Sequence, residues 1–223
     1  MIKYLIYIFL CIILGFLDFH FNLRGVLSIT FDVVLSIYII VCNRENIKTN
    51  FILSFDYRLL CGVLLIFSML FFKEGLICFF YNNSIDYYDK VDFYFIVALV
   101  IKSFTEELIF RGYWLKNFLV RYNILISILI VSLGFAFLHF FGRNNAIFAF
   151  ISSLALSYIF YKSKSIMNNF LIHVSSNLFV IFLFPSILSY YSSIDERLKI
   201  ISICSVFIFI IFILKILRDS YRE

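Results

Sequence analysis

Two adjacent carboxylates, Glu106 and Glu107, and a guanidinium, Arg111, lie inside a largely apolar stretch that runs from Phe93 to Trp114. A charge in hydrocarbon costs about 2.5–3.5 kcal/mol on insertion scales, so three of them require a reason. Glu107 and Arg111 are four residues apart and can pair on one helix face. Glu106 lies about 100° round the helix and is left to act as a general base. The structural alternative is an ion-pair cluster that joins two membrane helices.

The composition indicates an all-α, polytopic membrane protein. The chain has 223 residues, of which 63% are hydrophobic, and apolar segments near 20 residues recur along its length. No hydrophilic block is long enough for a soluble domain, so residues 1–223 are predicted to form a single transmembrane domain. We predict about eight transmembrane helices: Ile2–Phe19, Val26–Cys42, Leu59–Phe80, Phe93–Trp114, Ile124–Phe141, Ala146–Tyr161, Ile166–Tyr190 and Leu198–Leu217.

The connectors predict the orientation in the membrane. With an even number of spans, both termini lie on one side, and eleven Lys and Arg residues fall on that side against five on the other. Because Lys and Arg accumulate in cytoplasmic connectors, this bias predicts a multi-pass protein with both termini cytoplasmic. We expect its location to be the cell membrane, of the bacterial plasma membrane type. The basic residues therefore indicate topology, and no nucleic-acid partner is expected.

Three further polar residues lie in predicted spans: His139, His173 and Asn177. Phe135 and His139 are four residues apart, as are His173 and Asn177, so each pair shares a helix face. Counted from the predicted inner turns at about 1.5 Å per residue, Glu106 and these three residues lie within one layer of the membrane. This coincidence favours a shared site over unrelated helix–helix hydrogen bonds.

In order and spacing, these motifs resemble those of the CPBP (Abi) family, the CAAX-prenyl-protease and bacteriocin-processing membrane proteins. The resemblance covers roughly residues 93–183. It implies an eight-helix membrane endopeptidase with a cavity open to the cytoplasm. It also implies that Glu106 is the catalytic base, that His139 helps to activate water, and that His173 and Asn177 stabilise the oxyanion. Arg111 would hold Glu107 and so orient the helix face that carries Glu106.

Two features of the site leave its chemistry open. Glu106, His139 and His173 could form a two-histidine, one-carboxylate zinc site, as in a metalloprotease, although no H-E-x-x-H motif is present. The resemblance does not decide whether a metal is needed. Lys102 lies four residues before Glu106, and if it pairs with Glu106 it weakens the base. No serine or cysteine lies in a nucleophile motif, so activated water is the expected nucleophile.

Two other classes of function remain alternatives. The chain could be a bacteriocin self-immunity or membrane scaffold protein that acts by binding, with the polar residues joining helices. It could also be a proton- or ion-coupled transporter that uses the buried carboxylates as relay groups, although no inverted repeat is visible. As a peptidase, its partners would be the lipid bilayer and a peptide or protein substrate at the membrane, whose identity the sequence does not give.

Overall fold

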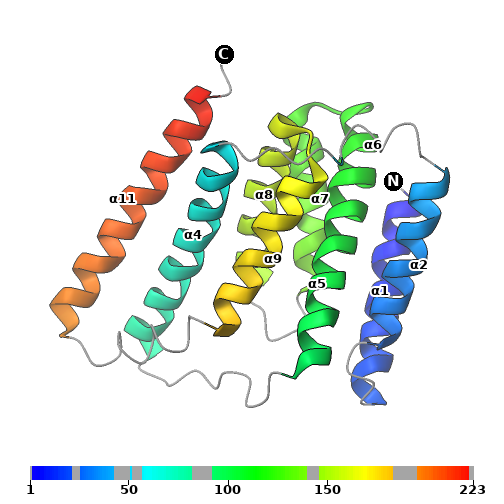
Figure 1. Ribbon diagram of the computed structural model, residues 1–223, viewed down its shortest axis with the longest axis horizontal. Helices are drawn as coiled ribbons and strands as arrows, with labels where there is room; N and C mark the ends of the chain where they lie inside the picture. The colour runs from blue at the N-terminus through cyan, green and yellow to red at the C-terminus, as the bar shows by residue number, and fades with distance from the viewer. Residues whose placement is uncertain are drawn as a thin grey trace. The chain divides into compact units, whose positions relative to one another are not determined.

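The computed structural model describes residues 2–21, 26–42, 51, 57–81, 92–139, 146–182 and 195–220, and within these ranges the secondary structure is helical with no strand (Figure 1). The elements are α1 (Ile2–His20), α2 (Val26–Cys42), α4 (Tyr57–Tyr81), α5 (Phe93–Glu107), the π-helix η1 (Leu108–Leu115), α6 (Lys116–Leu119), α7 (Ile124–Leu138), α8 (Ala146–Ser163), α9 (Ile166–Phe182) and α11 (Glu196–Ser220).

The observed helices follow the predicted spans closely. Because α5, η1 and α6 are continuous, the described ranges contain eight helical rods, and each begins within two residues of a predicted span. The fifth predicted span extends past the helix, since α7 ends at Leu138 and His139 lies in the turn after it. The end of the seventh predicted span, residues 183–190 with Pro185, lies outside the described residues.

The chain divides into two compact units. The first contains residues 1–53 and 97–170, and the second contains residues 54–96 and 171–223. In the first unit α1 packs on α2, and α7 packs on α8; in the second, α4 and α11 lie side by side (Figure 1). Within the described residues, one helix, Ala146–Ser163, is long and apolar enough by itself to cross a membrane, and α2, α7 and α9 are shorter apolar helices.

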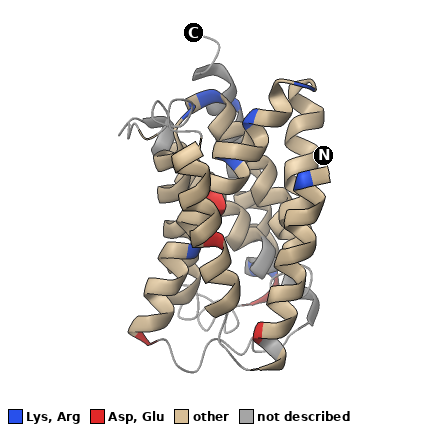
Figure 2. Ribbon diagram, turned by 90° about the vertical axis from the view of Figure 1, so that its right-hand side faces the viewer, with Lys and Arg blue, Asp and Glu red and all other residues tan. Residues whose placement is uncertain are grey.

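The first unit exposes many apolar side chains and buries polar and charged ones beside its hydrophobic core. Exposed positions on α1 and α2 include Phe9, Phe16, Val34 and Val41. The buried set includes many polar or charged residues, among them Asp32, Ser103, Thr105, Glu106, Glu107, Arg111, Ser127, Ser132, Ser153, Ser157 and Asn169. Figure 2 shows charged residues midway along helices as well as at their ends. Apolar side chains on the surface, with polar and charged groups buried between helices, are expected of a protein in lipid.

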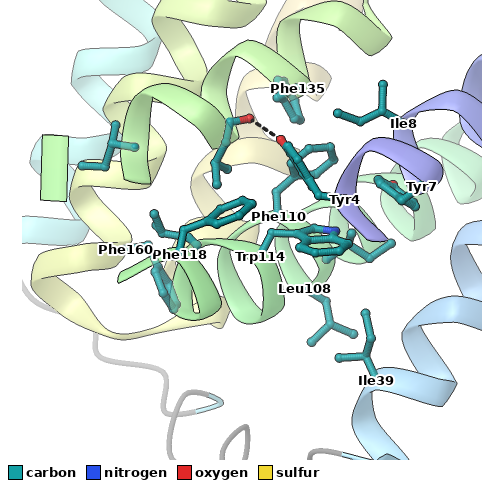
Figure 3. Close-up of a cluster of buried hydrophobic side chains, with 14 of the residues drawn as sticks. Tyr4, Tyr7, Ile8, Ile39, Leu108, Phe110, Trp114, Phe118, Phe135 and Phe160 are labelled. Carbon is teal, nitrogen blue, oxygen red and sulfur yellow. Dashed lines mark hydrogen bonds between the residues drawn. The ribbon is translucent and has the colours of Figure 1, made fainter. Parts of the chain in front are cut away.

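The π-helix η1 is the centre of the first unit and contacts α2, α7 and α8. Its buried Phe110 and Trp114 pack against Tyr4 and Tyr7 of α1, with ring centroids 4.8 Å apart for Tyr4 and Trp114 and 5.9 Å apart for Tyr7 and Phe110 (Figure 3). A π-helical turn changes which residues face a neighbouring helix, and such turns are frequent at functional sites. The aromatic cluster therefore fixes the segment immediately after the two glutamates.

Gly134 of α7 is predicted to be intolerant of a side chain, because an added Cβ would overlap the hydroxyl of Tyr4. That hydroxyl donates a hydrogen bond to the carbonyl of Val131 at 3.1 Å (Figure 3). We expect Gly134→Ala to destabilise the fold by about 1–3 kcal/mol through overpacking, measured as a lower thermal unfolding midpoint in detergent. Gly15→Ala is the matched control, since nothing lies within 4 Å of its added Cβ. Equal midpoints for the two variants would contradict this packing.

Candidate functional site

Glu107 and Arg111 form a fully buried ion pair at the junction of α5 and η1. Nη1 of Arg111 lies 2.8 Å from Oε1 of Glu107, and both side chains are 0% exposed. Nη2 of Arg111 donates to Oγ of Ser153 on α8 at 2.8 Å, and the guanidinium lies 4.9 Å from the centre of the Phe135 ring. The pairing predicted from the four-residue spacing is thus present. It joins η1 to both α7 and α8.

The second oxygen of Glu107 is also occupied. Nδ2 of Asn169, in the first turn of α9, donates to Oε2 of Glu107 at 3.3 Å and to the carbonyl of Leu156 at 2.7 Å. Both carboxylate oxygens of Glu107 therefore accept hydrogen bonds from buried donors. These bonds compensate the cost of burying the Glu107 charge.

Glu106 has a different environment from that of its neighbour. Its Oε1 lies 3.4 Å from Nζ of Lys102, one helical turn earlier on α5. The same ammonium lies 3.2 Å from Oδ2 of Asp32 on α2 and donates a hydrogen bond to it. The Lys102 side chain is 41% exposed, whereas those of Glu106 and Asp32 are buried. Lys102 thus approaches Glu106, as its spacing allowed, but shares its charge with a second carboxylate.

His139 comes directly after α7 and is held by its own helix. Its Nδ1 lies 2.8 Å from the carbonyl oxygen of Phe135, and its ring stacks on the Phe135 ring with centroids 4.4 Å apart. A carbonyl oxygen only accepts, so Nδ1 carries the hydrogen of this bond. In the neutral imidazole, Nε2 then has the lone pair that a base or a metal ligand needs. Phe135 also contacts Arg111, which connects His139 to the buried ion pair.

His173 and Asn177 lie four residues apart on α9 and belong to the second unit. His173 is buried and Asn177 is half-buried. The hydroxyls of Ser175 and Ser176 donate to the carbonyls of Ile172 and His173, at 3.0 and 2.7 Å. These bonds direct both hydroxyls to the helix backbone, in agreement with the expectation that neither serine is a nucleophile. The shared layer predicted for Glu106, His139, His173 and Asn177 stays a prediction.

Residues 90–179 match the family model described as "Type II CAAX prenyl endopeptidase Rce1-like". Over this segment the chain is Rce1-like. The resemblance indicated by the glutamate, histidine and asparagine motifs is therefore confirmed over these residues, as a similarity to the CAAX prenyl endopeptidases that the model describes. No curated protein and no solved structure matches the chain.

The Rce1-like segment includes all six residues predicted from the sequence: Glu106, Glu107, Arg111, His139, His173 and Asn177. It also includes two that were not predicted. Asn169 lies four residues before His173. The polar face of α9 that His173 and Asn177 share therefore begins one turn earlier than expected. Ser153 has no distinctive spacing, and only its contact with Arg111 identifies it. Asp32 lies outside the segment, in a part of the chain where no motif was visible.

Zinc remains a prediction. Among the described residues, no three His, Cys, Asp or Glu side chains form a group that could hold a metal ion. Glu106 and His139 belong to the first unit, and His173 belongs to the second. The ammonium of Lys102 lies 3.4 Å from the carboxylate that would bind the metal. A cation at that distance repels a divalent ion, so the residues of the first unit fit zinc poorly.

Proposed function

We propose that the chain is an intramembrane endopeptidase that hydrolyses peptide bonds of membrane-associated peptides or protein C-terminal tails. The observation that carries this proposal is the division of roles between two adjacent glutamates. Glu107 is enclosed by Arg111 and Asn169, whereas Glu106 faces a half-exposed lysine that also serves another carboxylate. A carboxylate whose neighbouring cation is shared with a second carboxylate is better suited to take a proton from water.

In the proposed reaction Glu106 is the general base and His139 helps to activate the water. Donation from Nδ1 of His139 to the Phe135 carbonyl supports this role, because it orients the ring and places the lone pair on Nε2. The water oxygen attacks the peptide carbonyl carbon, and the C–N bond then breaks as the amine leaves with a proton. The resemblance assigns stabilisation of the oxyanion to His173 and Asn177, and an imidazolium or an amide can donate to a developing negative oxygen.

The proposal also includes the location of the protein in the cell and its orientation in the membrane. The apolar outer positions of α1 and α2 favour contact with lipid, and the distribution of Lys and Arg favours a plasma membrane protein with both termini cytoplasmic. The substrate would then be a peptide or protein tail that reaches the cytoplasmic face. The family description names CAAX prenyl endopeptidases, so a prenylated C-terminal peptide is the first substrate to test, beside bacteriocin leaders and other membrane peptides.

His139→Ala tests the proposed role of the histidine. We expect the rate of peptide cleavage to fall by about 10²–10⁴-fold, the usual contribution of general acid–base catalysis. The measurement is cleavage of a fluorogenic peptide library by purified protein in detergent. His20→Ala is the matched control, because His20 ends α1 in an exposed position, and it should cleave at the wild-type rate. Wild-type cleavage by His139→Ala would rule out this role.

One observation favours the alternative of a bacteriocin self-immunity or scaffold protein that acts by binding. Lys102 contacts Glu106, and an ammonium beside a carboxylate stabilises its charged form and makes it a weaker base. If the chain confers immunity, Glu106→Gln separates the two functions. An immunity phenotype that persists in this variant favours binding, and one that disappears while the protein still folds favours proteolysis.

A further inference from the structure

We infer that Asp32 is a positioning residue for Glu106: by holding the ammonium of Lys102, it prevents Glu106 from being neutralised in an exclusive ion pair. The inference rests on the proposed function in one respect, namely that the charge of Glu106 matters for catalysis. Asp32 lies on α2, outside the segment that matches the family model, so neither the motifs nor the match includes it.

Asp32 is held in place by donors from two other helices. It is 3% exposed. Its Oδ1 accepts a hydrogen bond from the hydroxyl of Tyr7 on α1 at 3.2 Å, and its Oδ2 accepts one from Nζ of Lys102 at 3.2 Å. A buried carboxylate is costly unless hydrogen bonds compensate it, so both contacts oppose any movement of Asp32 away from Lys102.

The aromatic core fixes the geometry of this arrangement. The Tyr7 ring stacks on Phe31, the neighbour of Asp32, with centroids 6.1 Å apart, and meets Phe110 of η1 edge to face at 5.9 Å. These contacts hold α1, α2 and η1 together around the carboxylate. The position of Asp32 relative to α5 is therefore set by packing that does not depend on Lys102.

Lys102 is shared between two carboxylates. Its Nζ lies 3.2 Å from Asp32 and 3.4 Å from Glu106, and an ammonium has three hydrogens to donate. One positive charge between two negative charges compensates each of them less than it would compensate one alone. If the charge of Asp32 is removed, Glu106 is the carboxylate of this pair that still interacts with Lys102. Glu106 would then be fixed as a fully paired anion and would be a poorer proton acceptor.

The test is the reactivity of Glu106 with dicyclohexylcarbodiimide, which modifies neutral carboxyl groups in apolar surroundings. Purified full-length protein in detergent is treated, and modification at Glu106 is quantified by peptide mass spectrometry. We expect Asp32→Asn to lower modification by roughly threefold or more relative to wild type. In the double variant Asp32→Asn/Lys102→Met, the cation is gone, and modification should rise above the wild-type level.

If Asp32 only stabilised the fold, the single variant would not lower modification of Glu106 while the double variant raises it. Asp195→Asn is the matched control, since Asp195 is exposed at the start of α11, and Glu106→Gln defines the background signal. Unchanged modification in Asp32→Asn, or modification in the double variant as low as in the single one, would overturn the inference.

Two features keep the test decisive. If Asp32→Asn does not fold, Asp32→Ser replaces it, because it also removes the charge that holds Lys102; modification of Glu106 should again fall, and no change would contradict the inference. The readout is chemical modification and needs no substrate. The inference can therefore fail while wild-type protein still cleaves peptides, and it can hold in a protein that cleaves none.

Discussion

Replacement of Arg111 by Met is expected to destabilise the protein by about 3–5 kcal/mol, the largest effect on stability that we predict. The change leaves the carboxylate of Glu107 buried with no cation, in a site where both side chains are 0% exposed. It also removes the hydrogen bond to Ser153 on α8. The measurement is the thermal unfolding midpoint in detergent, together with the yield of monodisperse protein.

Two further variants separate the charge from the loss of side-chain volume. Glu107→Gln/Arg111→Met removes both charges and should recover part of the lost stability, because no unpaired ion remains. Arg121→Met removes an exposed guanidinium beyond α6 and should change the midpoint little. If Arg111→Met unfolds at the wild-type temperature, the buried ion pair does not stabilise the fold as described.

The adjacent glutamates should respond in opposite ways to the same substitution. Glu106→Gln should lower kcat by about 10²–10⁴-fold with little change in KM, because it removes the base and retains the shape of the side chain. It should cost little stability, since Lys102 keeps its hydrogen bond to Asp32. Glu107→Gln should instead lower the unfolding midpoint, because it leaves Arg111 as an unpaired buried cation.

This contrast is a strict test of the proposed division of roles. Each variant serves as the control for the other, since the two residues are neighbours and the chemical change is the same. Steady-state cleavage kinetics and thermal unfolding are measured on both. The assignment of roles would be wrong if Glu106→Gln lost stability but kept its activity. It would also be wrong if Glu107→Gln lost activity but kept its stability.

The features that depend on local rules were predictable from the sequence. Long apolar segments give helices, so the helices begin close to the expected residues. Four-residue spacing on a helix gives a shared face, so the contact between Glu107 and Arg111 and the approach of Lys102 to Glu106 were both predictable. The family resemblance rested on motifs of the same local kind and was confirmed over residues 90–179.

The features that the sequence did not predict depend on contacts between distant segments. Asp32 lies 70 residues from Lys102 in the chain, and Asn169 lies 62 residues from Glu107. A single aspartate in an apolar helix has many potential partners, and only the packing of α1 and α2 around η1 selects Lys102. The π-helix itself was also not predicted, because the apolar pattern of residues 108–115 is compatible with an ordinary α-helix.

The central claim is that Glu106 is the base of a peptidase, and one cleavage assay tests it most directly. Purified wild-type protein, Glu106→Gln and chelator-treated wild-type protein are incubated in detergent with a prenylated C-terminal peptide and a fluorogenic peptide library. We predict that untreated and chelator-treated wild type cleave the same peptide and that Glu106→Gln does not. Cleavage lost on chelation would replace this mechanism with that of a metalloprotease. Cleavage by Glu106→Gln at the wild-type rate would contradict the central claim.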